Sequence, residues 1–459
     1  MYNISSSSKT PLHIQLFKQL KQDIEQNFKA GDKLNSIRKV ASLYNLSKNT
    51  VESAYSQLVA EGYIESYPKS GYLVTDTYYK DSQTTISSVI IQENEKENYL
   101  YDFIPARLEK GSFPLKLWKR IFTKVIDESL DFGTYSSGQG EFALREQIAK
   151  YIIQSRGVKC QTNQVIVCGG LADSLSILAR ILHKTHNTLA IENPGYYVAK
   201  NVFESFGYNI NKIPLDENGI SIEALNLTNA KLVYTTPSHQ YPTGVAIPIS
   251  NRLKLLHWAK DKDALIIEDD YDSELSYDNR PIPSLQGLDK NDKVVYIGTF
   301  SKSLCATLRI SYMVLPQHLM KEYNKLYDAY FSSVPLMMQK TMEHFMSEGH
   351  WDRHLRKIRT LNRKKHNLMR SLLKDTLCNT IKIESSGAGL AILINPTVDF
   401  DWDKLKKITK EKKMKLYFAK DKSGGDWEAI RMGFGGFTEK ELPLAMKVFF
   451  KIWEQCIVK

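Results

Sequence analysis

The sequence predicts two folded units, a small helix-rich domain followed by a large α/β domain. Its 459 residues are too many for one compact core, because a single domain usually holds about 150. Residues 78–99 are rich in Ser, Thr, Asn, Gln and charge, a composition typical of a linker. The part that follows alternates short apolar runs with amphipathic helical patterns, as α/β folds do. We therefore expect domains at 1–77 and 100–459, joined by that linker.

The composition narrows the class of protein. Hydrophobic residues make up 42% and charged residues 25%, which excludes collagen-like, disordered and disulfide-scaffold chains. Lys and Arg number 62 against 51 Asp and Glu, and the net charge of +11 favours an acidic partner such as nucleic acid. The 5 cysteines are far apart and form no C-x-x-C pair, so neither a zinc site nor a disulfide framework is indicated. The sequence contains no signal peptide and no membrane-spanning apolar run, so we expect a cytoplasmic protein.

The N-terminal segment predicts three helices and a β-hairpin. Apolar residues at four-residue spacing indicate a first helix across residues 11–28. A second helix begins at Ser36, and Ser47 is a good N-cap for a third. Two β-like runs follow, Tyr63–Ser66 and Tyr72–Thr75. This order predicts a winged helix-turn-helix, whose third helix enters the major groove of DNA, although a helical bundle used for protein contacts also fits the pattern.

Polar side chains at the start of the third helix are candidates for DNA contacts, because they can hydrogen-bond bases or phosphates. They are Ser47, Lys48, Asn49 and Thr50. The tip of the hairpin adds Lys69, Ser70 and Gly71. The run KLNSIRKVASLYNLSKNTVESAYSQLVAEGYIESYPKSGYLV resembles the winged helix of GntR-type regulators, with Asn35 in place of the usual proline and Glu52 at an often basic position. The resemblance implies DNA binding and adds Arg38 to the contact residues.

Three residues of the large segment suit an aldehyde cofactor. Lys302 follows the apolar run Val294–Ile297, and its amine can form a Schiff base. Asp269 follows Ala264–Ile267, at a strand end, where α/β proteins bind ligands. Its carboxylate can keep a pyridine nitrogen protonated, so that the ring acts as an electron sink. Tyr271, two residues further on, faces the same way in an extended chain and can bond the ring hydroxyl.

A phosphate group needs hydrogen-bond donors, and the same segment offers two sets of them. Gly169 and Gly170 precede a helix that begins near Ala172, and helix N-termini bind anions. The backbone donors of that turn are Gly170, Leu171 and Ala172. Hydroxyl groups and a guanidinium come from Thr299, Ser301 and Arg309. Each piece alone is a common turn, helix cap or surface lysine, but their joint order along one α/β segment indicates a pyridoxal phosphate (PLP) site.

The motifs NPGY, YPTG, DDY and SKSLCATLR resemble those of the fold-type I aminotransferases. The resemblance covers the chain after the linker and implies a large mixed α/β part over about 130–315 and a smaller C-terminal α+β part over about 316–459. One position departs from the family pattern. Tyr241 stands where these enzymes have the asparagine of N-P-T-G, which leaves His239 or Gln240 to replace it.

The same resemblance assigns three further residues. It implies that Tyr135 reaches the phosphate of the neighbouring subunit and that Tyr196 stacks on the cofactor ring. Arg431, in the motif IRMGFG, would grip a carboxylate of the effector or substrate, a bidentate task that suits a guanidinium.

A winged helix joined by a linker to an aminotransferase-like domain resembles the MocR subfamily of GntR-type regulators. The resemblance implies a transcription regulator that binds PLP as an internal aldimine on Lys302 and senses the cofactor or an amino compound reacting with it. It also implies a head-to-tail homodimer on double-stranded operator DNA. The segment SKNTVESAYSQLVAEGYIESYPKSGYLV is most similar to regulators of vitamin B6 synthesis, the PdxR-like group. Regulators of γ-aminobutyrate or D-alanine metabolism are the alternatives.

Two other classes of protein stay open. A working PLP-dependent aminotransferase with an accessory N-terminal domain would turn over an amino donor and a keto acid. A regulator would carry out only aldimine exchange or half of a transamination, without turnover. A DNA-binding protein whose large domain merely dimerises would be colourless when purified.

Residues 350–370 predict a helix with a strongly basic face. Its basic residues are Arg353, Arg356, Lys357, Arg359, Arg363, Lys364, Lys365 and Arg370. A solvated face is the simpler interpretation, and contact with the DNA backbone is the sharper one. In the second case, charge reversal at Arg363, Lys364 and Lys365 would flatten the salt dependence of DNA binding.

Overall fold

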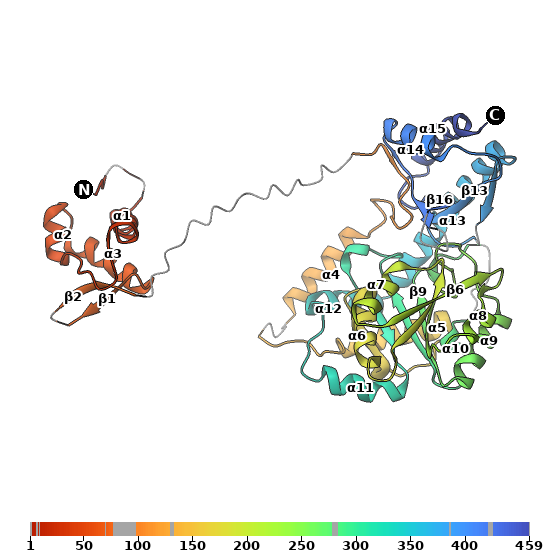
Figure 1. Ribbon diagram of the computed structural model, residues 1–459, viewed down its shortest axis with the longest axis horizontal. Helices are drawn as coiled ribbons and strands as arrows, with labels where there is room; N and C mark the ends of the chain where they lie inside the picture. Colours follow the sequence, from red (N-terminus) through yellow and green to blue (C-terminus); the bar gives the residue numbers. More distant parts are fainter. Residues whose placement is uncertain are drawn as a thin grey trace. The chain divides into compact units, whose positions relative to one another are not determined.

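The chain forms two compact units, Met1–Glu97 and Asn98–Lys459, which are described separately (Figure 1). The computed structural model describes residues 2–5, 8, 10–68, 70–76, 98–128, 133–277, 283–384, 387–420 and 426–458. Across these ranges, no helix is both long enough and apolar enough to cross a membrane.

The N-terminal unit is a winged helix-turn-helix, as the sequence predicts. Its elements are α1 (Leu12–Asn27), α2 (Ile37–Leu43), α3 (Lys48–Ala60), β1 (Ile64–Tyr67) and β2 (Gly71–Val74). The hydroxyl of Ser47 accepts a hydrogen bond from the Thr50 N–H and so caps α3. Leu20 of α1 packs with Tyr55 and Leu58 of α3 in one apolar core. The two strands pair antiparallel to form the wing.

The large unit is built around an eight-stranded sheet in the order β4-β11-β10-β9-β8-β5-β6-β7. The strands are β4 (Val165–Cys168), β5 (Thr188–Asn193), β6 (Asn209–Asp216), β7 (Gly219–Ile220), β8 (Leu232–Thr235), β9 (Leu265–Asp270), β10 (Val294–Thr299) and β11 (Ser311–Val314). Strands β8, β9 and β10 run parallel to one another, whereas β11 is antiparallel to its two neighbours. The carboxyl ends of β8, β9 and β10 therefore meet at one edge of the sheet.

Helices cover both faces of this sheet (Figure 1). They are α4 (Leu115–Asp127), α5 (Phe142–Arg156), α6 (Leu171–Leu182), α7 (Tyr197–Ser205), α8 (Ile222–Asn226), α9 (Ile249–Asp261), α10 (Leu285–Leu288), α11 (Gln317–Tyr327) and α12 (Leu336–Ser347). Successive residues of β4 enter different cores, because side chains alternate across a strand. Ile166 packs with apolar residues of α6 and α7, and Val165 and Val167 pack with those of α4, α5 and α12.

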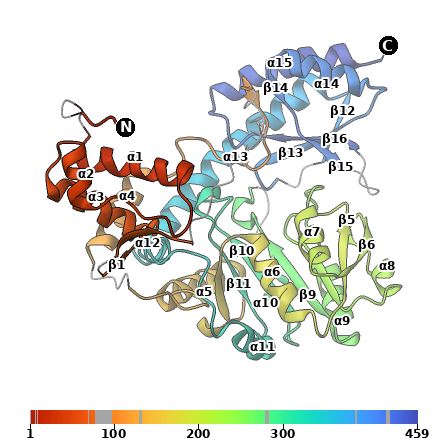
Figure 2. The same ribbon diagram turned by 60° about the vertical axis from the view of Figure 1, so that its left-hand side comes forward.

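A second, four-stranded sheet in the order β12-β13-β16-β15 forms the smaller part of this unit. Its strands are β12 (Ile381–Glu384), β13 (Ala391–Pro396), β15 (Phe418–Lys420) and β16 (Asp426–Gly433), and its helices are α14 (Trp402–Glu411) and α15 (Glu441–Cys456). Helix α13 (His350–Leu377) connects the two parts (Figure 2). Leu355 lies in the core of the large sheet, and Met369 and Leu373 lie in the core of the small one.

Short elements complete the unit. Strand β3 (Tyr101–Asp102) pairs parallel with β14 (Met414–Lys415) and brings the start of the unit to its smaller part. Three 3-10 turns are η1 (Thr162–Gln164), η2 (Ser273–Leu275) and η3 (Ala306–Leu308). The arrangement is the fold-type I aminotransferase fold, with a large mixed α/β part and a smaller C-terminal α+β part, so the predicted fold class is confirmed.

Candidate functional site

A cavity of about 410 Å³ lies at the carboxyl ends of β8, β9 and β10. Ligands of parallel α/β folds bind at this edge of the sheet. Most of the residues that the sequence assigned to the cofactor and effector line it. They are Leu171, Tyr196, Asp269, Tyr271, Thr299, Ser301, Lys302, Arg309 and Arg431. The chain thus brings together, in one cavity, residues that lie up to 260 positions apart (171 to 431).

Asp269 lies at the end of β9, is 3% exposed and lines the cavity. Its carboxylate accepts a hydrogen bond from the hydroxyl of Tyr234. Burial raises the pKa of Asp269 to about 7; the Tyr234 hydrogen bond opposes this rise and the adjacent Asp270 adds to it. Among the described residues, no arginine or lysine forms an ion pair with Asp269. A buried carboxylate without a cation fits a protonated ring nitrogen, which would supply the missing charge.

Lys302 lies in the turn after β10, on the wall of the same cavity. Burial lowers the pKa of its amine, because the ammonium form loses hydration there. Asp272 and Asp269 oppose this shift and Arg431 adds to it. A lysine with a lowered pKa has more free amine, the form that attacks an aldehyde.

A cradle for an anion lies between the start of α6 and the turn after β10. Among the residues that the structure describes, no side chain caps α6, so its first backbone N–H groups can bind an anion. Gly170 has a φ of +106°, and a Cβ atom there would clash with the Arg309 guanidinium. The Nη2 atom of Arg309 donates to the Gly169 carbonyl at 3.1 Å, and the Thr299 hydroxyl lies 3.0 Å from that of Ser301. The cradle has the guanidinium, hydroxyl and helix-end donors that a phosphate needs.

Three assigned residues lie outside the set that lines the cavity. The N–H of Gly170 donates to the Ser311 hydroxyl at 3.0 Å. Ala172 is exposed in the first turn of α6. Tyr135 is 77% exposed, and its ring stacks on that of Phe331 with centroids 4.1 Å apart.

Tyr241 stands in place of the family asparagine, and the two residues before it, His239 and Gln240, have different surroundings. Gln240 is 1% exposed, and its amide nitrogen donates to Glu192 at 3.1 Å and to the Pro194 carbonyl at 2.9 Å. It therefore holds the loop together. His239 lines the cavity, and its Nδ1 atom lies 2.8 Å from Oδ2 of Asp272. Of the two residues, His239 is the one placed to contact a ligand.

Arg431 projects from β16 toward Tyr241. Its guanidinium carbon lies 4.2 Å from the centroid of the Tyr241 ring, a cation–π contact. Tyr196 packs edge-on against the same ring, with centroids 5.0 Å apart. The tyrosine that departs from the family pattern therefore orients the arginine expected to hold a carboxylate.

Two residues of the site escaped the sequence interpretation, Tyr234 and Asp272. Tyr234 is the third residue of β8 and reaches the neighbouring strand β9, where Asp269 lies. Asp272 precedes η2 and orients His239. Both contacts depend on which strands and loops become neighbours. The one available signal was the proximity of Asp272 to the DDY motif.

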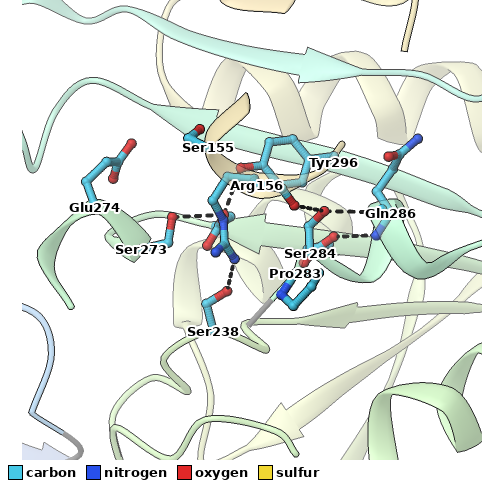
Figure 3. A network of polar contacts seen from close by, with 12 residues as sticks. Ser155, Arg156, Ser238, Ser273, Glu274, Pro283, Ser284, Gln286 and Tyr296 are labelled. Atoms are coloured by element: carbon cyan, nitrogen blue, oxygen red, sulfur yellow. Dashed lines mark hydrogen bonds and ion pairs between the residues drawn. The ribbon is translucent and has the colours of Figure 1, made fainter. Parts of the chain in front are cut away.

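Asp270, the last residue of β9, forms a buried polar network with Arg156. Figure 3 shows Arg156 together with Ser238, Ser273 and Tyr296 of this network. The Nε atom of Arg156 lies 2.6 Å from Oδ2 of Asp270, which also accepts from the hydroxyls of Tyr296 and Ser273. Burial alone would raise the pKa of Asp270, but the charge of Arg156 and the hydrogen bonds from Tyr296, Arg156 and Ser238 together outweigh burial, and the pKa is lowered. Nη2 of Arg156 donates to the hydroxyl of Ser238 at 2.7 Å, next to His239 in the chain.

The winged-helix residues assigned to DNA contact include two that cap α3 and others that are exposed. The Ser47 hydroxyl lies 2.7 Å from that of Thr50, so these two side chains cap α3. Lys48 and Asn49 are exposed on the same turn, and Arg38 is exposed on α2. Gly71 begins β2 with a φ of +98°, a conformation that favours glycine at the wing. Lys69 lies outside the described residues.

The basic face of α13 is smaller than its composition suggests. Its exposed basic residues are Arg353, Arg356, Lys357, Arg359, Arg363 and Lys364. Lys365 is 0% exposed, and its amine lies 2.6 Å from the Glu109 carboxylate. The expectation that Lys365 shares this face is wrong, because the helical period directs it into the interior.

The fold and the cavity define a class of protein, a DNA-binding winged helix joined to an aminotransferase-type domain. The family model of Bacterial regulatory proteins, gntR family, matches residues 12–74. The model of Aminotransferase class I and II matches residues 106–416. A kynurenine aminotransferase of Pyrococcus horikoshii has the same fold, with a TM-score of 0.70 and 21% identity over 78% of this chain and 91% of that one.

Curated relatives match most of the chain. The HTH-type transcriptional regulator YdeL of Bacillus subtilis is 35% identical over 97% of this chain and 97% of its own length. The probable rhizopine catabolism regulatory protein MocR of Rhizobium meliloti is 33% identical over 86% and 83%. The pyridoxine biosynthesis regulator PdxR of Corynebacterium glutamicum is 29% identical over 80% and 79%. The chain belongs to the MocR subfamily of GntR-type regulators.

Proposed function

We propose that this protein is a transcription regulator whose DNA binding responds to PLP held at Lys302. The observation that carries the proposal is the single cavity that gathers Lys302, Asp269 and Arg309 in a chain that also has a GntR-type winged helix. When bound, PLP supplies an aldehyde that condenses with amines and a ring that acts as an electron sink.

Each wall of the cavity has one task toward the cofactor. Lys302 provides the amine, and its lowered pKa favours the reactive form. Asp269 keeps the ring nitrogen protonated, and Tyr234 orients the Asp269 carboxylate. Tyr196 covers the ring. Arg309, Thr299, Ser301 and the first turn of α6 bind the phosphate.

His239 takes the place of the missing family asparagine beside the ring hydroxyl. Asp272 fixes the orientation of the imidazole, and Tyr271 donates to the His239 carbonyl at 2.9 Å. Arg431, held by Tyr241, binds the carboxylate of an incoming amino compound. Amine exchange at the cofactor, without net turnover, is sufficient for a sensor.

Two copies of the chain act together on DNA. The ring of Tyr135, 77% exposed, belongs to the phosphate cradle of the neighbouring subunit in a head-to-tail homodimer. Each winged helix then reads one half-site, with Lys48, Asn49 and Arg38 facing the DNA.

PLP itself is the effector that we favour. The relative named as a pyridoxine biosynthesis regulator supports it. A cavity in which more of the lining residues are assigned to the cofactor than to an amino compound supports it too. A ligand that binds one conformation better shifts the protein toward it, so cofactor loading can alter operator affinity. An amino compound bound at Arg431 is the second possibility.

A working aminotransferase is the other candidate function, and the presence of both Lys302 and Asp269 on the walls of one cavity favours it. Steady production of a keto acid from an amino donor would support the enzyme. A single round of amine exchange would support the regulator.

Footprinting of the full-length protein on its own upstream DNA tests the proposal. PLP without any amino acid should change the operator affinity of the wild-type chain, and Lys302→Ala should abolish the response while DNA binding persists. Equal affinity with and without PLP in the wild type would overturn PLP as the effector.

A further inference from the structure

A second cavity, of about 300 Å³, lies between α5, η2 and α13. It shares none of its lining residues with the cavity that holds Lys302. Its volume is at the lower end of the range for small-molecule sites, roughly 300–1,000 Å³. The cavity is therefore large enough for a small metabolite and independent of the cofactor position.

The wall of this cavity carries an unsatisfied buried carboxylate. Glu274 is 7% exposed, and its Oε1 atom accepts from the Tyr151 hydroxyl at 2.9 Å. Its Oε2 atom is buried and has no hydrogen-bond partner in the part of the chain that the structure describes. Burial raises the pKa of Glu274 to about 7. A buried carboxylate oxygen without a partner is unfavourable, so Glu274 lacks a donor, which the ammonium group of a ligand can supply.

Opposite charges line the same cavity. Arg356 and Arg359 are exposed on α13, one turn apart, and both line it. The Nε atom of Arg359 donates to the Glu274 carbonyl at 2.9 Å, which fixes that side chain beside the carboxylate. Asp352 also lines the cavity, one turn before Arg356. Among the described residues no ion pair is formed by Arg356, and a guanidinium binds a carboxylate through two parallel hydrogen bonds.

We propose that this cavity binds a small zwitterion of the amino-acid type, with its ammonium group at Glu274 and its carboxylate at Arg356. The proposal goes beyond the cofactor site and does not depend on PLP binding. It requires only that one ligand carry both charges, because a simple anion leaves Glu274 unpaired and a simple cation leaves Arg356 unused.

The turn η2 would transmit the presence of this ligand to the first cavity. Ser273 and Glu274 line the second cavity, and the preceding residue, Asp272, lines the first and orients His239. Arg156 lines the second cavity and donates to Asp270 and to Ser238. Figure 3 shows its contact with Ser238. A ligand bound at Glu274 therefore acts on residues 272–274, a short segment that contributes to the lining of both cavities.

Thermal unfolding of the full-length protein tests the proposal. Treatment with sodium borohydride first blocks any reaction of amines with a lysine-bound cofactor. The common amino acids are then tested singly at about 10 mM, where a ligand with a Kd near 0.1 mM stabilises the fold by a few degrees. We expect at least one amino acid to raise the unfolding midpoint. Its analogues without the amine or without the carboxylate should bind at least tenfold more weakly.

Three variants locate the site. Glu274→Gln and Arg356→Gln should each weaken binding of that amino acid at least tenfold, and Arg356 is exposed, so its variant retains the fold. Glu146→Gln, an exposed carboxylate of α5 paired with Lys150, should bind as the wild type does. The proposal fails if no amino acid shifts the midpoint. It also fails if binding survives both site variants, or is lost only in Arg431→Ala, which would place the ligand in the first cavity.

Discussion

Asp269 and Asp270 are neighbours on β9, but the protein treats their charges in opposite ways. Asp270 is paired with Arg156 at 2.6 Å and accepts two hydroxyl hydrogen bonds, and its pKa is lowered. Within the described part of the chain, Asp269 accepts a side-chain hydrogen bond only from the Tyr234 hydroxyl, and burial raises its pKa to about 7. The alternation of a strand sends one carboxylate into the structural network and the other into the cavity. Oδ1 of Asp270 has no hydrogen-bond partner among the described residues, so the contrast between the two aspartates lies in the ion pair. A carboxylate that is paired with a guanidinium of the protein maintains the fold, and one that has no counter-charge among the described residues marks a place for a cationic group of a ligand.

The largest loss of stability should come from removing the ion pair between Arg156 and Asp270. Arg156→Met leaves Asp270 buried and uncompensated, and breaking such a pair costs about 3–5 kcal/mol of unfolding free energy. Urea denaturation followed by tryptophan fluorescence measures it, since all 6 tryptophans lie after residue 98. The exposed pair of Lys150 with Glu146 is the control, and Lys150→Met should cost about 0.5 kcal/mol or less. Equal losses of unfolding free energy in Arg156→Met and Lys150→Met would contradict the distinction between the buried and the exposed ion pair.

A change at Asp269 should have the reverse effect, a loss of ligand affinity with little loss of stability. Asp269→Asn removes the charge that we propose to face the ring nitrogen but breaks no ion pair of the described residues, so the fold should keep its stability. A hydrogen bond to a charged group is worth about 1.5–3 kcal/mol, so the affinity for PLP should fall roughly 10- to 100-fold. Equilibrium dialysis against PLP gives the affinity. An unchanged Kd would show that Asp269 does not face the cofactor.

The pH dependence of stability gives a second measure of the same contrast. A carboxyl group with a pKa raised on folding binds its proton more tightly in the folded chain, so its contribution to stability falls as the pH rises from its unfolded pKa to about 7. In the cofactor-free protein, Asp269→Asn should therefore lose less stability than the wild type over that window. Glu268 and Glu274 have raised pKa values in both proteins, so the difference between the two curves isolates Asp269. Parallel curves would mean that the pKa of Asp269 is not raised.

The smallest effect is expected on the winged helix, where the same contrast recurs. Ser47 and Thr50 satisfy each other in the cap, whereas Lys48 is exposed on the same turn. Lys48→Ala should weaken DNA binding about equally for all sequences and reduce the slope of log affinity against log salt by about 1. Fluorescence anisotropy over a salt series measures that slope. A change in sequence preference with an unchanged slope would assign Lys48 to a base instead.

The sequence was informative where function and local structure coincide. Ser47 was predictable as a cap, because capping is decided within four residues. Asp269 and Lys302 were predictable as parts of one site, because parallel strands end at one edge of a sheet. Tyr234 and Asp272 were not, since their partners depend on which strands and loops become neighbours. The prediction that Lys365 lies on the basic face was wrong, because charge alone does not show that a long helix turns one lysine toward Glu109.

The central claim is that the cavity lined by Asp269 and Lys302 holds PLP, bound to Lys302. Borohydride reduction of the PLP-loaded protein, followed by proteolysis and mass spectrometry of the peptides, tests it most directly. The account predicts a reduced pyridoxyl adduct on Lys302 and none in Lys302→Ala. An adduct on another lysine, or none in the loaded wild type, would contradict it.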